Sequence, residues 1–261
     1  MRQRLLHLLA CLLISIARGG EPARPDASKF AEGAYVFERN CLICHGPRGD
    51  GNGEWAAGLL PKPRSFREGM FKFRTTPFGS LPTDDDLRKT IRGGLSGTAM
   101  GAFTALGEDE VTTVMEYVKF FSRRWRKAEN YAEPMLFPPA PAWLSDAKGR
   151  AAHAHLGRVI FNNACAVCHG EKADGQGPAA AALKDVWNLP CRPSDLRNEH
   201  LRCGDGPADL YRLLSTGMNG TPMQSFDKVL TESQRWEVIA FILSVRVPSP
   251  PLLGAAPVSQ R

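Results

Sequence analysis

Apolar residues recur at helical spacing in several stretches of the chain. Phe30 and Ala34, four positions apart, share one face of a helix predicted over residues 29–40, because such positions lie on the same side of a helix. Longer helices are predicted over residues 109–123 and 232–245, and the second begins at T-E-S-Q, a capping-box pattern that marks a helix start. These patterns predict an all-α fold.

The same pattern occurs twice, at a spacing of 124 residues (41 to 165). Nine residues of the first half recur at this spacing: Gly33, Phe37, Cys41, Cys44, His45, Gly46, Asp50, Gly51 and Gly53 are matched by Gly157, Phe161, Cys165, Cys168, His169, Gly170, Asp174, Gly175 and Gly177. Further along, G-T-A-M at 97–100 recurs as G-T-P-M at 220–223. The repeat predicts a tandem duplication of one helical fold.

The repeat divides the chain into two predicted domains, residues 28–125 and 151–247. Residues 126–150 between them carry four prolines and predict a stiff linker, with Phe137 and Trp143 expected to lie along a domain surface. A linker of this length predicts two domains that fold separately.

The chain begins with the features of an export signal. Arg2 and Arg4 precede an apolar stretch over residues 5–16, and these 12 residues are fewer than the about 20 that a membrane span needs. We expect a signal peptide over residues 1–20 and export to the periplasm, with an uncleaved membrane anchor as the alternative. Residues 248–261, rich in Pro, Ala and Ser, are predicted to form a flexible tail.

Two pentapeptides carry the strongest chemical signal, C-L-I-C-H at 41–45 and C-A-V-C-H at 165–169. C-x-x-C-H is the attachment sequence of c-type haem, because two thiols three positions apart reach both vinyl groups of one porphyrin and place the next His under the iron. Two complete motifs predict two covalently attached haem c groups. The predicted attachment residues are Cys41, Cys44, Cys165 and Cys168, and the predicted proximal iron ligands are His45 and His169.

The sixth iron ligand must come from elsewhere in each copy. Met100 and Met223 follow the proximal histidines by 55 and 54 residues and share the G-T-x-M context. A soft thioether favours reduced iron and raises the potential relative to a second histidine. Methionine also fills core gaps, but Met218 corresponds to Leu95, which cannot bind iron, and Met70, Met115 and Met135 have no counterpart in the second copy. We therefore expect Met100 and Met223 as the distal ligands.

Two cysteines fall outside the haem motifs and the N-terminal segment. Cys191 and Cys203 are expected to form a disulfide, as is usual in an oxidising compartment. The alternatives are a thiolate of one of them on the second haem iron, or two free thiols.

Basic residues in the loops near the predicted haems are candidates for neutralising propionates, against the alternative of a solvated positive loop; they are Arg64, Lys72, Arg74, Arg192, Arg197 and Arg202. Gly94 and Gly217 are expected to let the backbone pass close to the porphyrin. Of the 33 Lys and Arg residues, three leave with the signal (Arg2, Arg4 and Arg18), so the formal net charge falls from +6 to +3. This balance gives no reason to expect a nucleic acid partner.

These motifs resemble the class I cytochrome c family in its tandem, dihaem form, over about residues 29–123 and 153–246. The resemblance implies two all-α cytochrome domains, each with covalent haem and His/Met axial ligation at the positions above. The stretch F-K-F-R-T-T-P-F-G-S-L-P-T at 71–83 is similar to cytochromes that act as haem subunits or partners of respiratory oxidoreductases.

Three functions are compatible with this sequence. The first is a periplasmic protein that passes single electrons between a donor and an acceptor protein and binds no substrate. The second is an enzyme, either a dihaem peroxidase, which needs an iron free of methionine, or a thiosulfate-oxidising cytochrome, which needs Cys191 or Cys203 on iron. The third is a haem subunit held in a larger respiratory complex. We expect electron transfer without enzymatic activity.

Overall fold

The computed structural model describes residues 26–198 and 200–247. The predicted signal peptide, Cys11 and the predicted flexible tail lie outside the described residues. Within the described part, the chain forms helices and loops with two isolated bridges, Lys184 to Pro190 and Asn198 to Val247, and no strand. The prediction of an all-α fold is confirmed.

The helices occur in the same order in both halves of the chain. We call the part of the chain from α1 to α4, loops included, the first module. Its helices are α1 (Phe30–Asn40), α2 (Leu42–His45), α3 (Asp84–Gly93) and α4 (Glu108–Phe120). The second module contains α5 (Ala147–Ala164), α6 (Ala166–His169), α7 (Pro207–Thr216) and α8 (Glu232–Val245). Short 3-10 turns lie between them: Ala27–Lys29, Ala56–Gly58, Arg123–Arg126, Ala128–Asn130, Ala142–Leu144 and Ala180–Ala182.

Helix boundaries follow local capping chemistry. Helix α8 begins at the predicted position because Thr231 and Gln234 form a capping box, in which each side chain accepts a hydrogen bond from the other residue's backbone N–H. Helix α4 ends three residues before the predicted end, at Phe120. Beyond it, Ser122 caps a separate 3-10 turn that buries Trp125, so the chain leaves the helix there.

A glycine lets the first and last helices of each module pack closely. A Cβ atom at Gly33 of α1 would overlap the Thr113 carbonyl of α4, and one at Gly157 of α5 would overlap the Glu237 carbonyl of α8. The atoms nearest to each glycine are backbone atoms of the last helix, and the Cβ of Tyr117 also lies near Gly33.

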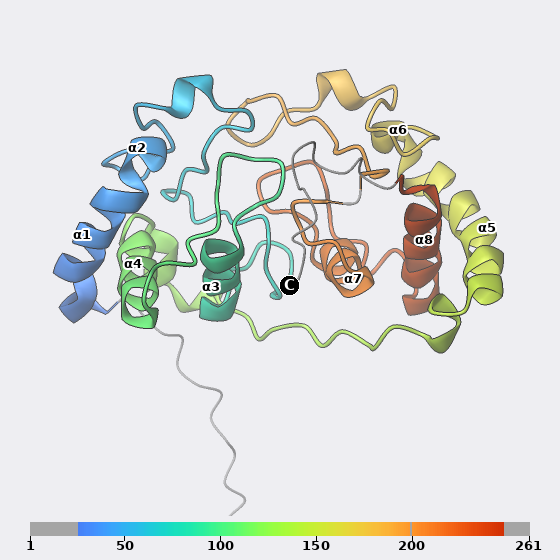
Figure 1. Ribbon diagram of the computed structural model, residues 1–261, viewed down its shortest axis with the longest axis horizontal. Coiled ribbons are helices and arrows are strands. Elements are labelled where there is room, and N and C mark those ends of the chain that lie inside the picture. Colours follow the sequence, from blue (N-terminus) through green and yellow to red (C-terminus); the bar gives the residue numbers. More distant parts are fainter. Residues whose placement is uncertain (1–25, 199, 248–261) are drawn as a thin grey trace, which may run out of the picture.

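The two helix pairs form the ends of the molecule. Helices α1 and α4 lie at one end and α5 and α8 at the other, with α3 and α7 between them (Figure 1). The linker after α4 runs along one side of the molecule to α5. Phe137 of this linker packs edge-on against Tyr211, and Trp143 stacks on His153 at a centroid distance of 3.7 Å, as expected for residues along a domain surface.

The modules contact each other directly, which the length of the linker did not lead us to expect. The side chain of Arg74, in the first module, is 1% exposed and donates hydrogen bonds to the carbonyl oxygens of Thr216 and Gly217 in the second, at 2.6 and 3.2 Å. Asn219 accepts a hydrogen bond from the Gly79 backbone N–H at 2.8 Å and donates one to the Ser80 carbonyl at 3.0 Å. Buried polar contacts therefore join the modules directly.

The segment 71–83 crosses this interface in a fixed conformation. Asp86 of α3 accepts hydrogen bonds from the backbone N–H and hydroxyl of Thr75 and from the backbone N–H of Thr83, at 2.9 to 3.0 Å. Thr76 donates to the Leu81 carbonyl at 2.7 Å. The backbone N–H of Met135, in the linker, donates to the Thr75 carbonyl at 2.9 Å. The linker thus also stabilises the conformation of the segment 71–83 through this hydrogen bond.

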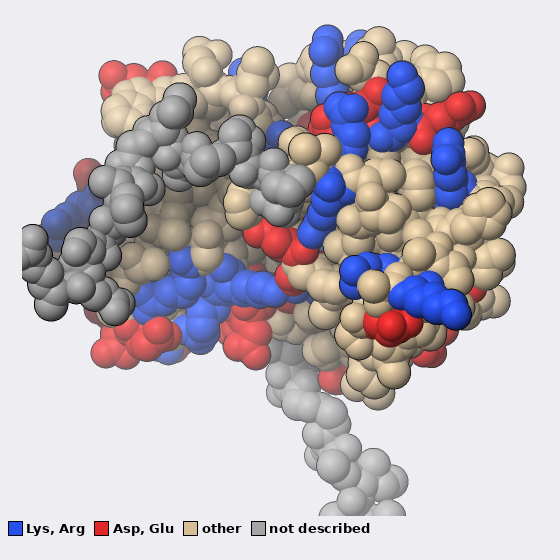
Figure 2. Space-filling model, turned by 45° about the vertical axis from the view of Figure 1, so that its right-hand side comes forward, with Lys and Arg blue, Asp and Glu red and all other residues tan. Residues whose placement is uncertain are grey.

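The surface mixes charges of both signs. On the face shown in Figure 2, Lys and Arg side chains alternate with Asp and Glu. Among the residues described, no helix is both long and apolar enough to span a bilayer.

Candidate haem-binding sites

Two cavities of the structure carry the predicted site residues. The first measures about 200 Å³ and is lined by Cys41, Cys44, His45 and Met100, together with apolar residues of α1, α3 and α4. The second measures about 250 Å³ and is lined by the corresponding residues Cys165, Cys168, His169 and Met223. All eight sequence-predicted site residues therefore lie on the walls of two cavities, four on each.

The C-x-x-C-H motifs fold as short helices that place both thiols on one wall. Helix α2 starts directly after Cys41, and the backbone N–H of Cys44 and of His45 donate to the Cys41 carbonyl at 3.2 and 2.9 Å. The corresponding distances to the Cys165 carbonyl are 3.1 and 2.9 Å. One helical turn thus brings the two thiols and the imidazole of each motif to the same cavity.

The imidazole of His45 is oriented by the loop that follows. Its Nδ1 lies 3.0 Å from the Arg64 carbonyl, and Nδ1–H donation to this oxygen leaves Nε2 available as a ligand. Burial lowers the pKa of His45 and of His169, which favours the neutral, metal-binding form. Nδ1 of His169 faces the backbone of Ser194 but is buried without a hydrogen bond of good geometry.

The two methionine loops have matching hydrogen bonds. In the first, Leu95 N–H donates to the Met100 carbonyl at 2.8 Å, and the Thr98 hydroxyl accepts from Met100 N–H at 3.0 Å. In the second, Met218 N–H donates to the Met223 carbonyl at 2.9 Å, and Thr221 accepts from Met223 N–H at 3.2 Å. The threonine of G-T-x-M thus stabilises the turn that presents the methionine.

The glycines before these loops allow the end of the helix to approach the backbone of the methionine loop, whereas the approach expected from the sequence was to the porphyrin. Gly94 and Gly217 end α3 and α7 with φ near +64°, a conformation that favours glycine. A Cβ at Gly94 would lie 2.7 Å from the Met100 carbonyl oxygen, and one at Gly217 would lie 2.6 Å from backbone atoms after Met223. Within the described structure, each glycine makes room for the methionine loop.

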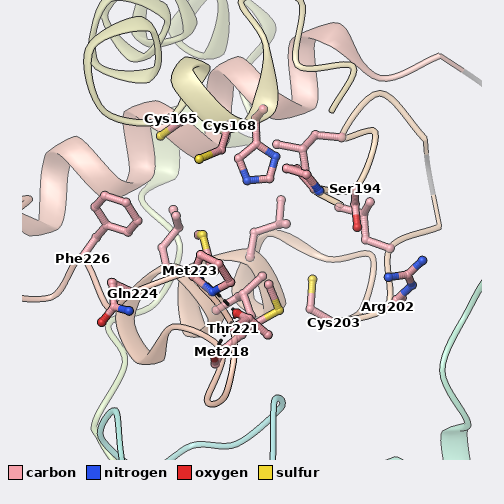
Figure 3. Close-up of a pocket in the computed structure, with 18 of the residues that line it drawn as sticks. Cys165, Cys168, Ser194, Arg202, Cys203, Met218, Thr221, Met223, Gln224 and Phe226 are labelled. Atoms are coloured by element: carbon pink, nitrogen blue, oxygen red, sulfur yellow. Dashed lines mark hydrogen bonds between the residues drawn. The ribbon is translucent and has the colours of Figure 1, made fainter. Parts of the chain in front are cut away.

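The methionine of the second site lies across the cavity from the thiols. Figure 3 shows Cys165 and Cys168 on one wall and Met223 on the opposite wall. Met218 also lines this cavity, where it takes the place that Leu95 has in the first. The residues present fit a haem, which Cys165 and Cys168 would attach covalently and whose iron His169 and Met223 would hold.

A model of the family described as cytochrome C oxidase, cbb3-type, subunit III matches residues 28–118 and again residues 152–242. The chain belongs to this family. The two matches, each with a complete C-x-x-C-H motif, confirm the tandem cytochrome c prediction and the two covalently attached haem c groups. The chain is a dihaem cytochrome of the electron-transfer type.

Two similar proteins are described as the cbb3-type cytochrome c oxidase subunit CcoP. That of Azospirillum brasilense is 26% identical over 157 residues, which cover 57% of this chain and 42% of the relative. That of Azospirillum sp. (strain B510) is 24% identical over 211 residues, which cover 78% of this chain and 57% of the relative. The chain spans about half the length of these curated relatives.

A solved structure resembles the chain over most of its length. It is a chain of the Kuenenia stuttgartiensis reducing HAO-like protein complex Kustc0457/Kustc0458, with a TM-score of 0.75 and 35% identity. The match covers 83% of this chain and 96% of that chain.

The expected disulfide between Cys191 and Cys203 is absent from the structure. Both thiols are free, and both residues line the second cavity. Burial raises the pKa of the Cys203 thiol to about 11, and this thiol lies 3.5 Å from the Gly204 carbonyl. The even number of leftover cysteines suggested a pair, whereas the fold uses both side chains as parts of the cavity wall.

Four of the six candidate basic residues reach the cavities. Arg64 lines the first, Arg192 and Arg202 line the second, and Lys72 lines both. The other two are engaged elsewhere, since Arg74 joins the modules and Arg197 pairs with Asp195 at 2.7 Å. Sequence analysis missed Phe73, which also lines both cavities, and Lys62, which lines the first. The alternation of aromatic and basic residues in F-K-F-R was the available signal for Phe73.

Proposed function

We propose that the chain transfers single electrons between redox proteins outside the cytoplasm, with both haem irons held by one histidine and one methionine. The observation that carries this proposal is the placement of the eight residues. In each cavity, a C-x-x-C-H motif and a methionine of identical loop geometry occupy the walls. Haem supplies reversible one-electron Fe(II)/Fe(III) chemistry in such a site.

The protein's own contribution is to hold and insulate the group. His45 and His169 would be the proximal ligands, and Met100 and Met223 the distal ones. The apolar cavity linings exclude water, and a thioether ligand raises the potential relative to a second histidine. With both axial positions taken by protein, no position is left for a substrate, which favours electron transfer over peroxidase chemistry.

The thiosulfate-oxidising alternative has less support. It requires a thiolate of Cys191 or Cys203 on the second iron. Met223, which the repeat matches to Met100, already lies across the cavity from the thioether-forming cysteines. We infer that Cys203 is a wall residue of the cavity.

We further propose that the chain works as a haem subunit of a larger oxidoreductase complex. This proposal is supported by the match to nearly the whole of one chain of the HAO-like complex at 35% identity, and by relatives described as oxidase subunits. The exported location rests on the N-terminal sequence features. Co-purification of a catalytic partner with the tagged chain from its native host is the expected result.

The ligand assignment is tested by spectroscopy on the purified holoprotein. Mass spectrometry should show two covalent haems, and the oxidised protein should show low-spin spectra with the weak thioether-to-iron band near the red edge of the visible range. A five-coordinate, high-spin haem at neutral pH would contradict the proposal.

A further inference from the structure

The two cavities share part of their wall. Of the residues that line them, Lys72 and Phe73 line both. Phe73 belongs to the first module by sequence, yet it packs against the hydrophobic core of the second. The segment 72–73 is therefore the partition between the two sites.

Hydrogen bonds from the residues that follow the partition fix its position relative to both modules. Arg74, the next residue, fastens it to the Thr216 and Gly217 carbonyls of the second module. Thr75 fastens it to Asp86 of the first module through two hydrogen bonds, at 2.9 and 3.0 Å. Lys72 thus has a backbone position fixed relative to both cavities.

Positive charge collects at this partition. Arg64 from the first module and Arg202 from the second lie close enough to Lys72 for their charges to act on it. The Arg64 guanidinium lies over the Trp187 ring of the second module, 4.1 Å from its centroid. Burial, followed by repulsion from Arg64, lowers the pKa of Lys72 to about 8.

Among the residues that the structure describes, no ion pair joins these cations to a carboxylate. The carboxylate of Asp185 and the thiol of Cys191 act on both Arg64 and Lys72, and the carboxylate of Glu68 also acts on Arg64. Arg64, Lys72 and Arg202 are half-buried, and a cation that is partly removed from water is stabilised by a negative charge nearby. Haem carries such charges in its propionate groups, and the cations line both haem cavities.

We propose that Lys72 is a positioning residue common to both haems, whose ammonium group lies among the propionates of the two groups while Phe73 fills the space between them. The inference rests on the two haem sites of the proposed function. Because a positive charge stabilises the reduced form of a nearby haem, one lysine raises both potentials together. The same lysine also couples the two potentials, since both haems interact with its charge.

The test is a spectroelectrochemical titration of the holoprotein and its variants. Lys72→Met should lower the potential of each haem by about 59 mV, which corresponds to a tenfold change in the reduction equilibrium constant of a one-electron couple. Lys72→Arg, which keeps the charge, should restore both. Two matched controls neutralise a charge at one cavity only: Lys62→Met at the first and Arg192→Met at the second. Each should move at most one potential.

A shift of only one potential in Lys72→Met, or of neither, would overturn the proposal. Equal shifts in both for Lys62→Met would also overturn it, because the effect would then be one of overall charge. If Lys72→Met does not fold, Lys72→Gln provides the same comparison with a polar side chain. Haem content and the thioether-to-iron band of the unmutated protein test the haem sites themselves, so failure of the proposed function is recognised separately.

Discussion

Arg74 provides a direct test of how the modules depend on one another. Its guanidinium is 1% exposed and reaches from the first module to the end of α7 in the second, where it binds the carbonyls of Thr216 and Gly217. A cation at a helix C-terminus also interacts favourably with the helix dipole. The chain continues from Gly217 directly into the loop that presents Met223. Removing Arg74 should therefore affect a ligand of the other module's haem.

The size of the effect follows from the contacts. In Arg74→Met the carbonyls of Thr216 and Gly217 lose their charged donor, as do those of Lys72 and Pro77 in the first module. Each acceptor left buried and unsatisfied costs about 1–3 kcal/mol. Part of this cost is offset because the variant no longer buries a guanidinium, whose pKa burial lowers to about 10. We expect a net loss of about 3 kcal/mol in the free energy of unfolding, within the range for breaking buried charged contacts.

The assay is urea unfolding of the holoprotein, followed by circular dichroism and by the thioether-to-iron band. Introducing Arg74→Met in a Met100→His background leaves only the second haem to contribute to this band. The band should then be lost at lower urea than in Met100→His alone. Arg88→Met is the control, because the ion pairs of Arg88 within the described residues are surface pairs with Asp85 and Glu108, worth at most about 1 kcal/mol. An Arg74→Met variant as stable as Arg88→Met would refute the reasoning.

Three further results are expected. In redox titrations, Met100→His and Met223→His should each retain both covalent haems and lower the potential of their own haem more than that of the other, whereas Met218→His should shift the second potential much less than Met223→His does. Gly157→Ala should lower the free energy of unfolding by about 1–3 kcal/mol, because its Cβ meets the backbone of α8, while Gly58→Ala, with open space around it, should not. Asp86→Ala should cost about 2–4 kcal/mol in urea unfolding, since it frees three donors.

The haem sites could be predicted from the sequence because their parts are local and duplicated. Each C-x-x-C-H motif contains its own helical turn, and each G-T-x-M loop is closed by its own threonine. Comparison of the copies also separated Met223 from Met218, because Met223 corresponds to Met100 whereas Met218 corresponds to Leu95, which cannot bind iron. The bounds of α8 were predicted for the same reason, as Thr231 and Gln234 are near neighbours.

The contact between the modules could not be predicted in this way. Arg74 binds main-chain carbonyls, and every residue type offers the same carbonyl, so no partner residue marks the contact in the sequence. The linker gave a misleading signal. Its length suggested two modules that fold separately. The structure requires that length for another reason, because the linker runs from α4 at one end of the molecule to α5 at the other (Figure 1).

The residues that differ between the two copies account for the contact between the modules, which the repeat alone did not predict. The repeated residues build two equivalent sites, but an interface between two copies needs surfaces that fit each other. The first module contributes the segment 71–83, with Lys72, Phe73 and Arg74, and the second contributes Trp187, which lies in its longer loop before Pro193. These unmatched segments meet at the partition between the cavities. Divergence after duplication therefore changed the segments that lie between the two cavities, while the C-x-x-C-H motif and the G-T-x-M methionine of each copy stayed the same.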